Sequence, residues 1–110
     1  MSQERRRHPR IVVEIPVRLE AEGATLGGRL HDICRDAALV ECGRTWPLET
    51  PVSIAFELPG TGGPLLVSGR VVRLATGAEG PTGMAILFTE VTPAAATRID
   101  FFFALNEGTV

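Results

Sequence analysis

The sequence contains no lysine and no tyrosine, and only two cysteines among its 110 residues. No apolar run approaches the roughly 20 residues that a membrane-spanning helix needs. The first ten residues, "MSQERRRHPR", have no apolar segment after their charges, so we expect neither a secretory signal nor membrane insertion. With hydrophobic residues at 45%, the chain has enough apolar material for one core, and we expect a single cytoplasmic domain.

The cysteines and histidines are too scattered to form a metal site. Cys34 and Cys42 do not form a CxxC pair, and His8 and His31 lie on different segments without zinc-ligand spacing. Scattered cysteines in a cytoplasmic chain are typically small buried hydrophobic residues. The sequence also lacks a Ser/His/Asp set or paired carboxylates in a catalytic context, so we expect no metal, no cofactor and no enzyme.

Positive charge is concentrated at the start of the chain. Residues 1–10 contain four arginines and one glutamate, a net charge of +3, although the whole chain has a net charge of −2. The remaining residues therefore sum to −5. Arginine presents a planar fork of donors that suits phosphate groups and the O6/N7 edge of guanine. GC-rich codon usage also favours arginine over lysine, so the clustering, and not the absence of lysine, is the informative feature.

Short apolar segments separated by glycine and proline follow this basic arm. The pattern predicts six strands, with Pro16 at an edge or a bulge and a bend at Arg35 and Asp36. Within "PVSIAFELP", alternation places four apolar side chains on one face: Val52, Ile54, Phe56 and Leu58. Six strands joined by short turns indicate an all-β antiparallel barrel or sandwich.

The last segment changes to a helical period. Thr92 is suited to the N-cap and Pro93 to the first helical position, and Asn106 to Gly108 is suited to the end of the helix. Three consecutive phenylalanines, Phe101, Phe102 and Phe103, would cover about 200° of the helix surface. One apolar stripe takes two of them, so the third lies either in a wide groove of this protein or on a surface for a protein partner.

The basic arm and a segment 22 residues later resemble the PilZ domain, a receptor module for the bacterial second messenger cyclic di-GMP. This family carries an RxxxR motif on an N-terminal arm, which Arg6 and Arg10 match, with Arg5 preceding them. The resemblance extends over most of the chain, including "VSGRVVRL" and "TGMAILFTEVTPAAATRID". It implies a flexible arm at residues 1–10, a six-stranded barrel at 11–91 and a C-terminal helix of the same domain at 92–107.

The second motif of the family, [D/N]xSxxG, is only partly matched. Asp32 stands at its first position, but Cys34 replaces the serine and Ala37 replaces the glycine. The resemblance implies that cyclic di-GMP is bound by the three arginines of the arm and by these three residues. The arginines would grip phosphates and guanine O6/N7, and the Asp32 carboxylate would accept from the guanine N1–H and N2–H₂ edge.

Purely structural roles are open for the same residues. The arm could be a solvated tail, Asp32 could cap the turn at Arg35 and Asp36, and Cys34 could be a packed small residue. A thiol is a weaker hydrogen-bonding group than a hydroxyl, and Ala37 would be strained if the position required a positive φ. Trp46 is expected to pack over a loop, with stacking on a purine as the alternative.

Two functions follow from the resemblance. In the first, the chain binds cyclic di-GMP and relays the signal to a protein partner that controls motility, pili or exopolysaccharide. In the second, it is an adaptor that does not bind the nucleotide and acts through protein contacts on the phenylalanine helix. Binding to a specific nucleic acid is disfavoured by the acidic body of the chain and the lack of an aromatic platform. We expect a monomer or a weak homodimer.

Overall fold

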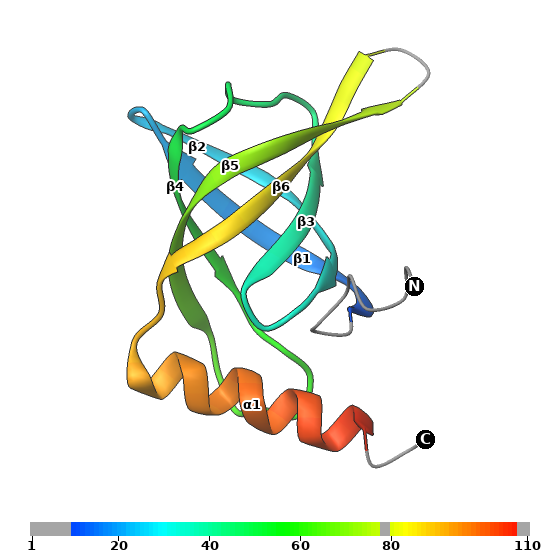
Figure 1. Ribbon diagram of the computed structural model, residues 1–110, viewed down its shortest axis with the longest axis vertical. Helices are drawn as coiled ribbons and strands as arrows, with labels where there is room; N and C mark the ends of the chain where they lie inside the picture. Colours follow the sequence, from blue (N-terminus) through cyan, green and yellow to red (C-terminus); the bar gives the residue numbers. More distant parts are fainter. Residues whose placement is uncertain (1–9, 78–79, 108–110) are drawn as a thin grey trace, which may run out of the picture.

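Six strands form a closed antiparallel barrel in the computed structural model, which describes residues 10–77 and 80–107 (Figure 1). Their order around the barrel is β1-β2-β3-β6-β5-β4, and pairing of β1 with β4 closes it. The all-β barrel expected from the sequence is confirmed. The strands are β1 (Ile11–Ala21), β2 (Ala24–Ile33), β3 (Ala37–Cys42), β4 (Pro51–Phe56), β5 (Leu65–Gly77) and β6 (Gly80–Glu90).

The interior is filled by the apolar side chains that alternate along the strands. In and just after β4, the four residues of the predicted inward face are all buried, with Ile54 and Leu58 completely so. Burying a side chain of this size stabilises the fold by about 1.5–3 kcal/mol. Trp46, in the loop between β3 and β4, is only 2% exposed, and its backbone N–H donates to the sulfur of Met84 at 3.3 Å. Its side chain belongs to the buried core, so it is not an exposed ring on which a purine could stack.

Pro16 lies beside a β-bulge, which was one of the two positions expected for it, a sheet edge or a bulge. Its neighbours in the ladder are on β2 alone, because β1 pairs with β4 only from Arg18 to Glu20. The bulge falls between Val12 and Ile15. A proline that has no N–H to donate fits this one-sided stretch of strand.

One helix, α1 (Pro93–Glu107), lies across one end of the barrel (Figure 1). The hydroxyl of Thr92 accepts from the N–H of Ala95 at 3.1 Å, which confirms the N-cap. No helix within residues 10–77 and 80–107 is long and apolar enough to cross a membrane.

Two of the three phenylalanines of α1 are buried and one is exposed. Phe102 is 4% exposed and Phe103 is fully buried, whereas Phe101 is 50% exposed. Phe102 and Phe103 meet edge to face, with their ring centroids 6.0 Å apart. Both rings help to close the end of the barrel, as expected if one apolar stripe takes two of the three. Phe101 is the exposed third ring, and a partner contact on this helix stays a prediction.

Candidate functional site

Asp32 lies on the outer face of the barrel because β2 contains a bulge. Leu30 pairs with Val40, and Asp32 pairs with Leu39, so His31 is an extra residue between the two pairs. Strict alternation from the buried Leu30 would direct Asp32 into the core. The extra residue instead places its side chain on the outward side shared with Leu39.

Arg73 reaches the outer face in the same way. On β5, Val71 pairs with Ile86 and Arg73 pairs with Ala85, so Val72 is the extra residue. The sequence analysis did not single out Arg73. The consecutive valines before it break the alternation of β5, and this was the available signal of a bulge.

The two bulges bring opposite charges onto one outward row. Leu39 and Ala85 pair with each other, so the row runs Asp32, Leu39, Ala85, Arg73 across β2, β3, β6 and β5. Three strand spacings put the backbones of Asp32 and Arg73 about 14 Å apart. A carboxylate and a guanidinium thus flank a small apolar surface.

A cavity of about 90 Å³ lies over this row. It brings together every described residue of the two motifs: Arg10, Asp32, Cys34 and Ala37. Arg73 also lines it, with a floor of Ala38, Leu39 and Ala85. Arg5 and Arg6, the other arginines expected to bind the ligand, lie outside the described residues.

The carboxylate of Asp32 is the most unusual group in the cavity. Asp32 is only 9% exposed, and its side chain forms no hydrogen bond or ion pair with any residue in the described part of the chain. It therefore does not cap the turn at Arg35 and Asp36. A carboxylate that is largely shielded from water is more stable when donors meet it, so this position favours a ligand that presents N–H groups.

The turn from Cys34 to Ala37 forms one wall of the cavity. The N–H of Cys34 donates to the carbonyl of Ala37 at 2.8 Å, and its thiol donates to Oδ1 of Asp36 at 3.2 Å. Burial raises the pKa of the Cys34 thiol above its ordinary value, and the neighbouring Asp36 carboxylate adds to this increase. The thiol is thus a neutral donor at neutral pH.

Ala37 occupies its position without backbone strain. The described non-glycine residues with positive φ are Glu14, Glu22 and Glu49, so the φ of Ala37 is negative. An L-residue is tolerated there. The departure from glycine therefore costs at most the space of one methyl group at the cavity wall.

A third bulge, on β1, lies directly beside Asp32. Val12 pairs with Asp32 and Ile15 with Leu30, so two residues of β1 oppose His31. One of them, Glu14, has φ of 50°, and its carboxylate lies 2.5 Å from Nδ1 of His31 and 3.7 Å from Nε of Arg29. These side-chain contacts link the bulge of β1 to the bulge of β2. Sequence analysis did not find this cluster, because it depends on the pairing of the two strands.

Comparison with known proteins places the chain in a well-defined group. The PilZ domain family matches residues 4–104. No curated protein sequence matches significantly. Among solved structures, the PilZ domain with c-di-GMP of YcgR from Escherichia coli is 17% identical, with a TM-score of 0.67, covering 96% of this chain and 94% of that one.

Two further structures share the fold. The PilZ domain of CeSA from a cellulose-synthesizing bacterium is 21% identical, with a TM-score of 0.66 over 89% of this chain and 98% of that one. The inhibitor of motility MotI/DgrA of Bacillus subtilis is 12% identical, with a TM-score of 0.78 over 96% of this chain. This chain spans about half of MotI/DgrA, since the match covers 53% of that protein.

Proposed function

We propose that this chain, which belongs to the PilZ domain family, binds cyclic di-GMP on the outer barrel face at Asp32 and relays the signal to a protein partner. The observation that carries the proposal is Asp32, a residue only 9% exposed, whose carboxylate no described residue meets with a hydrogen bond or ion pair. The N1–H and N2–H₂ donors of a guanine match a carboxylate with two free oxygens. The function is one of binding, without chemistry on the nucleotide.

The charges around Asp32 fit a dianionic ligand. Arg10, which directly precedes β1, and Arg73, on β5, line the same cavity. Arg5 and Arg6 precede Arg10 in the chain and would supply further guanidinium groups to the phosphates. Cys34 and Ala37 would form the wall against the base, with the neutral thiol in place of a hydroxyl.

Arg35 offers a route from the site to α1. It follows Cys34 directly, and its guanidinium pairs with Asp100 and stands 5.0 Å from the ring centre of Phe103. The neighbouring carbonyl of Asp36 accepts from the N–H of Phe88 at 2.8 Å. A ligand that moves this turn would therefore also move the contacts of Arg35 with α1, the helix that bears the exposed Phe101. The process controlled would be motility, pili or exopolysaccharide, in the cytoplasm where this second messenger acts.

The second candidate function is an adaptor that binds no nucleotide. The exposure of Phe101 and Leu105, 50% and 44%, favours it, because both are large apolar side chains on the outer side of α1. The engagement of the Cys34 thiol with Asp36 also favours it, since a hydroxyl would be the stronger ligand group.

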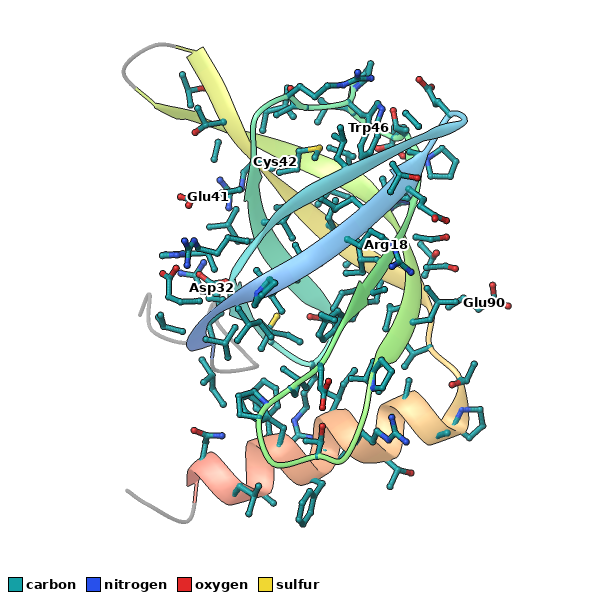
Figure 2. The ribbon with its side chains drawn as sticks, turned by 180° about the vertical axis from the view of Figure 1, so that it is seen from behind. Arg18, Asp32, Glu41, Cys42, Trp46 and Glu90 are labelled. Atoms are coloured by element: carbon teal, nitrogen blue, oxygen red, sulfur yellow. The ribbon has the colours of Figure 1, made fainter. Side chains whose placement is uncertain are left out.

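Isothermal titration calorimetry with cyclic di-GMP separates the two functions. We expect saturable binding to the native chain and loss of binding in the Arg6→Ala/Arg10→Ala variant. Asp32→Asn should weaken binding about ten- to a hundredfold, because a hydrogen bond to a charged group contributes about 1.5–3 kcal/mol. Arg18→Ala is the control, since Arg18 is exposed on β1 away from Asp32 (Figure 2). The absence of heat and of competition up to high micromolar nucleotide would establish the adaptor instead.

A further inference from the structure

A second, wider cavity lies on the outer face of the barrel beside the one at Asp32. Its volume is about 540 Å³, and its lining residues are Pro16, Gly28, Arg29, Glu41, Cys42 and Thr82. Ligand sites for small molecules have volumes of about 300–1,000 Å³. The cavity at Asp32, at about 90 Å³, is below this range and admits the edge of one base rather than a dinucleotide.

The pairing of β2 with β3 makes the two cavities neighbours. Asp32 pairs with Leu39, and Glu41 follows two residues later on the same outward side of β3. Asp32 and Glu41 are thus diagonal neighbours, whose backbones lie about 7–8 Å apart. Figure 2 shows both on the same side of the barrel, with Glu41 toward the end that bears Cys42.

The surface next to Glu41 is bare. Its partner on β6 is Gly83, and the next outward residue of that strand is Ala85. A Cβ at Gly83 would lie 3.0 Å from the carbonyl oxygen of Val40, so the position has little room for a side chain. A flat floor beside a carboxylate suits the plane and the edge of a base.

The carboxylate of Glu41 is available to a ligand. Glu41 is exposed, and its side chain has no hydrogen bond or ion pair with the residues that the structure describes. Arg29, its partner across the ladder, has its Nε 3.7 Å from Glu14. Guanine presents two adjacent donors, N1–H and N2–H₂, to a carboxylate. Adenine presents the N1 lone pair at the same edge, which a carboxylate repels.

We propose that the wide cavity binds the second base of the dinucleotide and that Glu41 determines the preference for guanine there. This inference rests on the proposed function, because it concerns the same ligand. Asp32 holds one guanine by its edge, and Glu41 holds the other from the adjacent strand position. Arg29 also lines the wide cavity, so its guanidinium would be available to a phosphate of the bound ligand.

The test compares cyclic di-GMP with 3′,3′-cyclic GMP–AMP, in which one guanine is replaced by adenine. Dissociation constants of both are measured by calorimetry for the native chain, Glu41→Gln and Glu20→Gln. Glu20 is exposed on β1 and lines a different cavity, so its variant removes one negative charge elsewhere. We expect the preference of the native chain for cyclic di-GMP to fall about tenfold in Glu41→Gln and to stay unchanged in Glu20→Gln.

A ratio of dissociation constants is insensitive to a general loss of folded protein, so it isolates the recognition of the second base. An unchanged ratio in Glu41→Gln, with cyclic di-GMP still bound, would overturn this inference and leave the proposed function standing. The same holds if the native chain binds the two nucleotides equally. Failure of the native chain to bind cyclic di-GMP would overturn both.

Discussion

The guanidinium of Arg35, in the turn between β2 and β3, forms an ion pair with the carboxylate of Asp100 on α1. The same guanidinium stands over the ring of Phe103, 5.0 Å from its centre. One side chain therefore connects the turn that carries Cys34 and Ala37 to both the polar and the buried side of the helix. This connection joins the candidate site to the helix that carries the exposed Phe101.

We expect Arg35→Ala to lower the free energy of unfolding by about 1 kcal/mol, as the sum of a surface ion pair and a cation–π contact. The side chains of Arg35 and Asp100 are 34% and 65% exposed, so the ion pair contributes the smaller share. The Asp100→Asn variant keeps the contact of Arg35 with Phe103, so it should lower the free energy of unfolding by less than Arg35→Ala does. Urea unfolding of both variants measures this order, and an equal or larger loss in Asp100→Asn would contradict it.

Truncation of Phe103 and of Phe101 to alanine should lower the stability of the fold by very different amounts. Phe103→Ala should destabilise the fold by about 3–5 kcal/mol, because a fully buried ring leaves a cavity at the end of the barrel. Phe101→Ala, at 50% exposure, should change stability by only about 0.5 kcal/mol. Thermal unfolding provides the comparison. A large loss for Phe101→Ala would mean that this ring is covered in solution, as in a homodimer.

The two departures from the family motif should have unequal effects on the affinity for cyclic di-GMP. Cys34→Ser should strengthen binding about two- to tenfold, since a hydroxyl hydrogen bond contributes about 0.5–1.5 kcal/mol. Ala37→Gly should not improve the backbone fit, because φ at this position is already negative. It should instead destabilise the strand by about 0.5–1 kcal/mol. Calorimetry and urea unfolding on the same preparations test both statements, and a gain in affinity only for Ala37→Gly would reverse the assignment.

The thiol of Cys34 should react slowly at neutral pH. Burial, together with the Asp36 carboxylate, raises its pKa above the ordinary value, so the reactive thiolate is scarce. The unfolded chain, with an ordinary pKa, loses this proton first. The stability contribution of the thiol is therefore present below the ordinary pKa and is lost as the pH rises through the folded pKa.

Alkylation by iodoacetamide, followed against pH in a Cys42→Ser background, measures the pKa of Cys34. Asp36→Asn should shift the alkylation profile to lower pH, because it removes the carboxylate charge beside the thiol while the backbone remains. A profile that does not move would show that burial alone sets the pKa.

Local patterns in the sequence were enough to predict the barrel. Alternation placed the apolar face of β4, turn residues separated the strands, and Thr92 with Pro93 marked the start of α1. These signals act within a few residues, so a single chain displays them. The candidate binding residues Arg10 and Asp32 also came from short motifs, and both line the cavity.

The face of the barrel on which the candidate residues lie was decided by the tertiary structure. Each bulge is a difference in register between two strands, and neither strand specifies it alone. Because side chains alternate with a period of two, one extra residue at His31 or Val72 moves everything beyond it to the opposite face. The sequence by itself determined that Asp32 belongs to a motif and that Arg73 follows two valines. Only strand pairing placed the two on one outward row, with Glu41 diagonal to Asp32.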